Sequence, residues 1–470
     1  MKETNLIPKL KEEIKPHLVP VLDPDFYPLG LFFSWYQNQV KEPGEKIRIG
    51  LERENQLISI WEGQVLPASE SNWPLTLIYV ERLVKFLLWQ KGAWKIYFQG
   101  SPAIYQYLKS NYSAEGKRKF DVDLMSTVYE KPFEVVLAEA DEFPEEKENQ
   151  LILGGHSDGC RLGFDLGASD FKVAALKDGQ VVFSDEFPWN PQSEPDPKYH
   201  YDHIQAGLKK AAAFLPKVEA IGGSAAGIYI NNQVRIASLF RAVSKEAFEK
   251  KVKNMFIEMQ KEWGVPLEVI NDGEVTALAG YLTLNDTGVL GVAMGSSEAG
   301  GYLHPSGHLP GWLDELAFAP VDLNPGASID EWSGDSGVGA MYFSQQAVNK
   351  LALSAGYSFP EEIKLPERLK EIQAKVEKGE KLAAQIFKDI GIYLGYTAQL
   401  YSLFYDYHHL MILGRVTSGP GGELIKQQAE KVLAIEFPEL ADKIKIHLTD
   451  EKSRRVGQAV AAATLPLIKK

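Results

Sequence analysis

Residues 163–172 read Gly163-Phe164-Asp165-Leu166-Gly167-Ala168-Ser169-Asp170-Phe171-Lys172. An apolar run delivers Asp165 at the end of a predicted strand, and a second strand resumes at Phe171. Asp178-Gly179 then predicts a tight hairpin turn into a third strand. Asp, Gly and Ser at such a bend suit a phosphate, because glycine permits close backbone approach and hydroxyl and amide groups donate hydrogen bonds to phosphate oxygens. An ordinary hairpin turn is the alternative interpretation of the same residues.

Composition and charge place the chain among soluble, globular proteins. Its 470 residues are 45% apolar and 24% charged, which is ordinary for a protein with a large buried core. A net charge of −13 does not favour binding to a nucleic-acid backbone. The single cysteine, Cys160, excludes an intrachain disulfide and a thiolate zinc cage. The charged start predicts no secretory signal, and no apolar stretch is long enough for a membrane span. We expect a cytoplasmic protein.

The first 150 residues form a block with its own pattern of mixed strands and helices. Alternating and helical apolar patterns predict strands at 46–51, 57–61, 94–98 and 132–137 and helices at 75–89 and 104–112. The acidic stretch 139–148 is typical of a solvated linker. The abundant aromatic residues favour a core or a domain interface over a ligand surface. We assign no chemistry to this block.

From residue 151 onward, strands alternate with helices, which predicts an α/β architecture. A strand at 218–224 ends in the small-residue turn 222–227, where a ligand could approach the backbone, and 245–263 has the pattern of an amphipathic helix. The strand at 267–270 ends in Asn271 and Asp272. A carboxylate here is either a helix cap or, at the ligand-binding edge of an α/β sheet, a general base for a bound hydroxyl.

Two further turns rich in glycine follow later strands. The strand 288–294 ends in Gly295-Ser296-Ser297-Glu298, and two such strand–turn–strand elements could bind one phosphate chain from both sides. The strand at 409–413 ends in Gly414 and Arg415 and leads through a Gly-rich turn to a helix at 423–433, which could seat a nucleotide. Neither turn is a Walker A or GxGxxG sequence.

Candidate metal and substrate ligands also occur outside these turns. Asp314 and Glu315 form a carboxylate pair in apolar company, which sugar hydroxyls could satisfy, although a solvated helix end is the alternative. His304 and His308 lie in a loop that contains proline and glycine, so metal binding there is disfavoured.

In this order, the motifs of residues 160–470 resemble the ROK family of sugar kinases and repressors, within the actin/hexokinase/Hsp70 superfold. The resemblance implies a first phosphate motif around Asp165, which could also hold Mg²⁺, and a second at the Gly295 turn. It implies Asp272 as the catalytic base on a sugar hydroxyl. The implied sugar-binding residues are Ser224, Gly227, Asn271 and Glu315. The implied ATP-binding residues are Asp165, Gly167, Ser169, Lys172, Gly295, Ser296, Ser297, Gly414 and Arg415.

Several departures from the family pattern weaken this reading. Phe318 stands where the family has a histidine, and no cysteine follows, so the resemblance implies loss of the structural zinc and of one sugar contact. A further sugar-binding glutamate would fall near Gly339 or Ala340. Glu298 lies in the second phosphate turn, where its charge would repel ATP unless a cation compensates.

The resemblance therefore implies an ATP- and Mg²⁺-dependent sugar kinase, without zinc, whose partner is a small-molecule sugar. The rival is a degenerate member that senses a sugar or nucleotide and catalyses nothing. We expect two ribonuclease-H-like lobes at 151–285 and 286–470 and an N-terminal α+β region at 1–150. A homodimer is expected from the family alone. No nucleic-acid partner is expected, because residues 1–150 show no helix-turn-helix pattern, and no membrane partner is expected, because no apolar stretch is long enough to span a bilayer.

Overall fold

A computed structural model gives the structure of residues 7–40, 44–67, 72–149, 153–449 and 451–468, with the backbone only for 7–9 and 451–456. The first six residues, from which no secretory signal is expected, lie outside this description. So does the expected domain boundary at 150–151. Within the described residues, none of the helices combines the length and apolar character needed to cross a bilayer.

The chain folds into two compact units that are not consecutive blocks. Unit 1 contains residues 1–149, 292–300 and 312–448, and unit 2 contains residues 150–291, 301–311 and 449–470. The N-terminal region thus shares unit 1 with most of the second expected lobe. Residues 449–470 join unit 2, which contains the first expected lobe.

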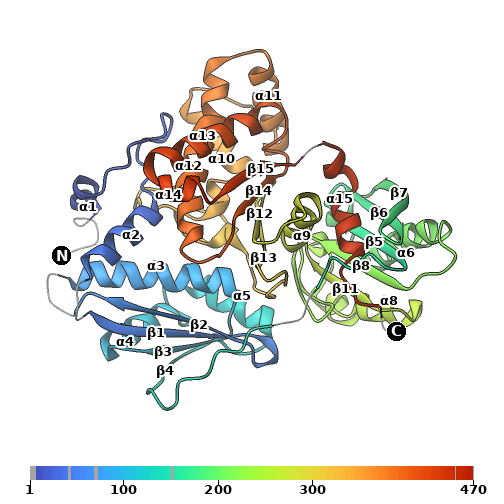
Figure 1. Ribbon diagram of the computed structural model, residues 1–470, viewed down its shortest axis with the longest axis horizontal. Helices are drawn as coiled ribbons and strands as arrows, with labels where there is room; N and C mark the ends of the chain where they lie inside the picture. Colours follow the sequence, from blue (N-terminus) through green and yellow to red (C-terminus); the bar gives the residue numbers. More distant parts are fainter. Residues whose placement is uncertain (1–6, 41–43, 68–71, 150–152, 450, 469–470) are drawn as a thin grey trace. The chain divides into compact units, whose positions relative to one another are not determined.

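Unit 1 begins with a four-stranded sheet whose strands match the alternating patterns of the sequence. The strands are β1 (Glu45–Glu52), β2 (Ile58–Val65), β3 (Lys95–Gln99) and β4 (Glu134–Leu137). Their order is β2-β1-β3-β4, with β1 antiparallel to both neighbours and β3 parallel to β4. The helix α3 (Trp73–Lys91) covers one face of the sheet (Figure 1). The inward residues Ile47, Ile49 and Leu51 of β1 are buried, as a period of two requires.

The other elements of unit 1 are mainly helical. In the N-terminal region they are α1 (Ile7–Glu13), α2 (Leu29–Gln39), α4 (Pro102–Asn111) and α5 (Lys119–Tyr129). In the C-terminal part they are α10 (Gln345–Ser354), α11 (Leu365–Glu377), α12 (Lys381–Ser402), α13 (Pro420–Glu436) and α14 (Pro438–Ala441). A second sheet, with order β13-β12-β14-β15, contains β12 (Val289–Met294), β13 (Glu298–Leu303), β14 (His409–Leu413) and β15 (Lys445–Leu448). Residues 289–291 of β12 and 301–303 of β13 are assigned to unit 2.

Unit 2 is built on a five-stranded sheet with the order β11-β8-β5-β6-β7. The strands are β5 (Cys160–Leu166), β6 (Asp170–Lys177), β7 (Gln180–Pro188), β8 (Ala220–Ala225) and β11 (Leu267–Asn271), and a small hairpin comprises β9 (Ile228–Ile230) and β10 (Gln233–Ile236). The first three strands are an antiparallel meander, and β8 and β11 continue the sheet in parallel. The helices are α6 (Pro197–Ala212), α7 (Lys245–Ala247), α8 (Met255–Trp263), α9 (Asp272–Leu284) and α15 (Glu451–Ala463).

The α/β class expected from the sequence is confirmed, with one correction to an element. The helix expected at 245–263 is interrupted: after α7 it continues as a short π-helix at Phe248–Val252, and α8 begins at Met255. The amide of Val234 in β10 donates to the carbonyl of Lys253 at 3.0 Å. The break between α7 and α8 therefore lets the Lys253 carbonyl accept this hydrogen bond from β10.

Candidate functional site

Strand register assembles the first candidate group, around Asp165 in unit 2. Asp165 lies opposite Lys172 in β6 on one side and opposite Ser224 in β8 on the other. The Lys172 Nζ lies 3.5 Å from Asp165 Oδ2, and the Ser224 hydroxyl donates to Oδ1 at 2.8 Å. Burial raises the pKa of Asp165, and the positive charge of Lys172 and the Ser224 hydrogen bond lower it again in part.

Ser224 is fully buried in this structure, and the sugar contact expected of it stays a prediction. Its hydroxyl is used to orient Asp165. A further partner of Asp165 had no signal in the sequence: Gln458 of α15 donates to both carboxylate oxygens at 3.1 Å when its amide is oriented to accept from Thr276. Asp165 is only 5% exposed and its carboxylate has three partners, so it does not suit direct coordination of Mg²⁺.

The turn between β5 and β6 is the part of this group that faces solvent. The amide of Gly167 donates to the carbonyl of Asp170 at 3.0 Å, and a Cβ at Gly167 would lie 2.8 Å from that oxygen. The indole of Trp189 donates to the Gly167 carbonyl at 2.8 Å, which fixes the turn. Ser169 is exposed and donates to the Asp170 carboxylate at 2.8 Å. The turn thus has an exposed hydroxyl, which bonds to Asp170, and exposed backbone near Lys172, whose Nζ lies 3.2 Å from Asp170 Oδ1.

The sequence left two roles open for Asp272, helix cap and general base. In the structure the helix cap is Asn271. Asn271 caps α9: its Oδ1 accepts from the amide of Gly273 at 2.7 Å, and its Nδ2 donates to the carbonyl of Gly227 at 2.7 Å. Asp272 is the first residue of α9 and is partly exposed. Burial, followed by the negative charge of Asp165, raises its pKa to about 6. A carboxylate with this pKa can accept a proton near neutral pH.

Gly227 has a backbone role beside this cap. Its φ of 128° is one that side-chain-bearing residues rarely adopt, and a Cβ would lie 2.4 Å from the carbonyl oxygen of Ile236. Gly227 thereby brings its carbonyl to Asn271. The only hydroxyl of the turn 222–227, that of Ser224, is buried. The sugar contacts expected of Gly227 and Asn271 stay predictions.

In unit 1, the Gly295 turn presents two exposed hydroxyls and conceals its carboxylate. Ser296 and Ser297 are exposed, and the amide of Gly295 donates to the Ser297 carbonyl at 2.9 Å. Glu298 is 3% exposed and accepts a hydrogen bond from the Tyr401 hydroxyl at 2.9 Å. Burial raises the pKa of Glu298 to about 8, so it is protonated at neutral pH. The expectation that Glu298 would repel ATP is therefore wrong, because its side chain is buried in the core and uncharged.

Gly414 brings the second Gly-rich turn of unit 1 against the end of β12. Its φ is 102°, and a Cβ would lie 2.4 Å from the carbonyl oxygen of Met294. The amide of Val416 donates to that same carbonyl at 3.1 Å. Arg415 is exposed between them. The turn that follows β14 thus starts next to the turn that follows β12.

Asp314 and Glu315, also in unit 1, are not equivalent. Asp314 is 2% exposed, adopts a φ of 47° and accepts from the Tyr405 hydroxyl at 2.7 Å. Burial raises its pKa to about 7. Glu315 is half-buried, and its amide donates to the carbonyl of Trp89 at 3.1 Å. Phe318, in the position of the family's histidine, packs on the ring of Trp89 at a centroid distance of 4.6 Å.

The predicted residues thus fall into separate groups within the two units. Unit 2 holds Asp165, Gly167, Ser169, Lys172, Ser224, Gly227, Asn271 and Asp272. Unit 1 holds Gly295, Ser296, Ser297, Glu315, Gly414 and Arg415. Within the described part of the chain, no cluster of three or more His, Cys, Asp or Glu side chains could hold a metal ion.

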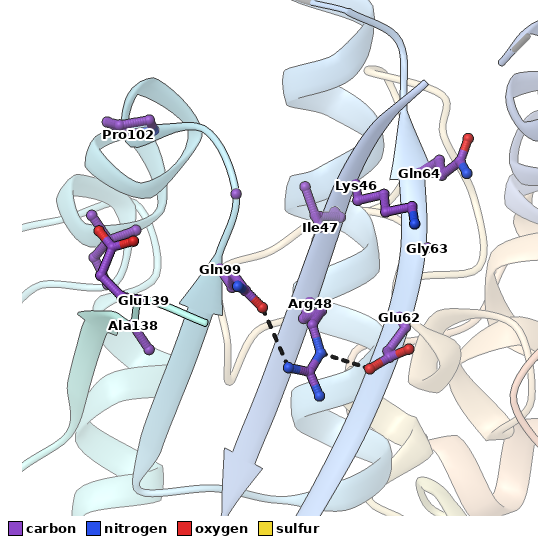
Figure 2. Close-up of a pocket in the computed structure, with 12 residues that line it drawn as sticks. Lys46, Ile47, Arg48, Glu62, Gly63, Gln64, Gln99, Pro102, Ala138 and Glu139 are labelled. Atoms are coloured by element: carbon purple, nitrogen blue, oxygen red, sulfur yellow. Dashed lines mark hydrogen bonds and ion pairs between the residues drawn. The ribbon is translucent and has the colours of Figure 1, made fainter. Parts of the chain in front are cut away.

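A cavity of about 730 Å³ lies elsewhere, on the sheet of the N-terminal region. Figure 2 shows Arg48 from β1 between Glu62 of β2 and Gln99 of β3, with an Arg48–Glu62 ion pair of 2.6 Å. None of the residues that line it is a predicted site residue. Its only charged pair in the described residues is Arg48–Glu62, and Lys46 and Glu139 at its rim are exposed, so we assign no ligand to it.

Comparison with known proteins identifies the fold. No family model matches the sequence, and no curated protein matches it. A solved ROK family transcriptional regulator, described as a homologue of the E. coli MLC protein, is 18% identical, with a TM-score of 0.50 over 65% of this chain and 77% of that one. A ROK family glucokinase from Streptomyces griseus bound to glucose and AMPPNP is 19% identical, with a TM-score of 0.49 over 65% and 98% of the two chains. A ROK hexokinase from Thermus thermophilus is 16% identical, with a TM-score of 0.49 over 65% and 97%. The likeness to the regulator shows a ROK fold.

Proposed function

We propose that this chain, which has the fold of ROK family proteins over 65% of its length, phosphorylates a sugar hydroxyl with ATP. One observation carries the proposal. Asp272 begins a helix at the edge of the unit 2 sheet, is partly exposed and has a pKa raised to about 6. Asn271 caps that helix, and the Asp272 carboxylate, which also receives backbone hydrogen bonds from Gly273 and Asp272, would act as the general base.

The other residues would bind and orient the reactants. The exposed hydroxyls of Ser169, Ser296 and Ser297 and the neighbouring amides would hold phosphate oxygens, and Lys172 would offset part of their charge. Arg415 would contact the nucleotide. Asn271, Gly227 and Glu315 would contact the sugar. Mg²⁺ would arrive with ATP and stabilise the charge of the transferred phosphoryl group. Asp272 would accept the proton of the attacking hydroxyl.

A second candidate is a sugar or nucleotide sensor without catalysis. The observation that favours it is the state of Asp165, whose carboxylate is occupied by Ser224, Lys172 and Gln458. The sensor would retain ligand binding and lose turnover. The solved regulator shows that a ROK fold also occurs in a transcriptional regulator. We propose no nucleic-acid partner here, because the chain carries a net charge of −13.

The first test measures the melting temperature of the full chain with Mg·ATP and with a panel of hexoses and amino sugars, each alone and together. Ligands that bind the native state raise the melting temperature by mass action. A coupled ADP assay on every sugar that shifts the midpoint then tests turnover. Stabilisation by both ligands with ADP release supports the kinase. Stabilisation by sugar without ADP release supports the sensor.

The Asp272→Asn variant tests the base. We expect turnover to fall by roughly 10²–10⁴-fold, because that is the usual contribution of a general base, while sugar affinity changes less than several-fold. The wild-type kcat/KM should fall about tenfold per pH unit below about pH 6, because the carboxylate becomes protonated there. Glu274→Gln, another carboxylate in the first turn of α9, is the matched control. Wild-type turnover in Asp272→Asn would remove Asp272 from the mechanism.

A further inference from the structure

The segment 313–336 of unit 1, which bears Glu315, is held at three places by residues of the N-terminal region. The first is the C-terminus of α3. The last four carbonyls of a helix lack partners within it. Here Leu88 accepts from the cap residue Gly92, and the next three carbonyls accept from the segment. These bonds are Glu315 to Trp89 at 3.1 Å, Asp314 to Gln90 at 2.9 Å and Leu313 to Lys91 at 3.3 Å.

The second place is the stretch that enters α2. The amide of Leu323 donates to the carbonyl of Tyr27 at 2.8 Å, and the amide of Leu29 donates to the carbonyl of Val321 at 3.0 Å. The amide of Tyr27 also donates to the Asp322 carboxylate at 2.9 Å. This carboxylate is buried and accepts a hydrogen bond of 2.6 Å from the Tyr342 hydroxyl. The two backbones are thus joined like neighbouring strands.

The third place is a buried charge cluster that only the segment completes. Arg82, Lys85 and Arg118 are buried together in α3 and at the start of α5. Their buried partners within the N-terminal region are two carboxylates, Glu81 and Asp121. Three cations therefore face two anions, and an unpaired buried charge is costly.

Asp335 supplies the third carboxylate. It lies 2.6 Å from Arg118 Nη1, 3.1 Å from Lys85 Nζ and 3.6 Å from Arg82 Nη1. Its side chain is 11% exposed, so these ion pairs are poorly screened by solvent. Losing Asp335 would leave the cluster one negative charge short.

We infer that the N-terminal region positions Glu315 for the sugar, with Arg82, Lys85 and Arg118 acting through Asp335 as positioning residues. This inference rests on the proposed sugar phosphorylation. It gives a role to residues 1–149, whose chemistry the sequence left unassigned. The charge cluster fixes one end of segment 313–336, and α3 fixes the end that bears Glu315. Loosening the end that bears Asp335 should therefore increase the mobility of the end that bears Glu315.

The test compares Asp335→Asn with wild type in the full chain. We expect faster hydrogen exchange at the amides of residues 313–315 and a sugar KM raised about tenfold, with kcat and the KM for ATP within twofold. Asp335→Glu, which retains the charge, should restore most of the sugar affinity. Arg118→Lys, which keeps the charge but loses the guanidinium group, serves as a second probe if Asp335→Asn does not fold, with the same expected direction.

Asp121→Asn is the matched control. Asp121 pairs with Lys85 and accepts from the Trp89 indole, both inside the N-terminal region, so this variant disturbs the same buried cluster without releasing the segment. Exchange at 313–315 that stays at the wild-type rate in Asp335→Asn overturns the inference. So does a rise in sugar KM that Asp121→Asn shares equally, because that would reflect general destabilisation.

The same experiment separates this inference from the proposed function. If wild type binds a sugar but releases no ADP with it, phosphorylation fails and the comparison is made on the sugar Kd from calorimetry. A Kd about tenfold weaker in Asp335→Asn then supports the positioning role, and an unchanged Kd overturns it. If wild type binds none of the sugars, both proposals are overturned.

Discussion

Glu298 shows how a single side chain changes the electrostatics of a turn. It follows two exposed serines, yet its carboxyl is buried against Tyr401, and the backbone of Gly339 leaves it room: a Cβ there would lie 2.0 Å from Glu298 Oε2. Its pKa of about 8 means that it carries a proton at neutral pH. Glu298 therefore adds no negative charge next to the hydroxyls of Ser296 and Ser297.

The titration of Glu298 makes a prediction about stability. Its pKa is raised in the folded state, so its contribution is fully present below the unfolded value of 4.5 and is lost as pH rises toward about 8. We expect the free energy of unfolding of Glu298→Gln to exceed that of wild type increasingly across this window, by roughly 1.4 kcal/mol per pH unit at most. Urea denaturation at pH 5 and pH 8 measures it.

Glu423→Gln, at an exposed position of α13, is the control for that experiment. If the difference between Glu298→Gln and wild type were the same at pH 5 and pH 8, Glu298 would not be protonated in the native protein.

At the scale of elements, α15 closes one face of the unit 2 sheet at very short range. Two glycines make this possible: a Cβ at Gly163 of β5 would lie 1.8 Å from the carbonyl oxygen of Ala459, and one at Gly222 of β8 would lie 1.6 Å from that of Ala462. Both obstacles are helix backbone, which cannot rotate away. The close approach also brings Gln458 to Asp165.

Gly222→Ala should therefore push α15 off the sheet. We expect the free energy of unfolding to fall by about 1–3 kcal/mol or more, as for other overpacked cores, and hydrogen exchange in residues 457–463 to accelerate. Gly326→Ala is the control, since the nearest atoms to its Cβ are 3.7 Å away. Unchanged exchange in α15 would mean that the sheet and helix can adjust to a methyl group.

Most elements follow from apolar periodicity, because each strand or helix buries its own alternating or 3.6-residue face. The strands β5 and β11 follow from their apolar runs. A helix cap was expected after β11, but at Asp272, whereas the structure has it at Asn271. Gln458 and the burial of Glu298 were not predictable, because their partners Asp165 and Tyr401 are distant in sequence and only the packed structure brings them close. The small-residue run 222–227 indicated a close approach, and at Gly222 the approaching group is the backbone of α15.

For the molecule as a whole, the main finding is that the N-terminal region belongs to the core of unit 1. The ring of Phe86 in α3 stacks on Phe404 at 4.2 Å, and Gln90 donates to the Phe404 carbonyl at 2.9 Å. Arg118 and Asp335 meet across a separation of 217 residues. The sequence predicted the elements of residues 1–149 but not their partners, since a local pattern shows that a face is apolar without showing what covers it.

This shared core predicts cooperative unfolding of unit 1. In hydrogen exchange at increasing urea, amides of α3 and of the C-terminal end of α12 should lose protection at the same urea concentration, because Phe86 of α3 packs on Tyr401 and Phe404 there. Earlier loss of protection in α3 than in α12 would show that residues 1–149 unfold as a separate domain.

The position of α15 in the chain also affects how the protein is made. The sheet that α15 covers begins at Cys160, whereas the helix itself is synthesised only after all of β14 and β15. At about 5–20 residues per second, the ribosome leaves an interval on the order of tens of seconds between them. During that time Ala174 and Leu176, which pack against Ala459 and Ala463 in the finished protein, have no cover. Nascent chains of this protein should therefore need a chaperone on this face until α15 emerges.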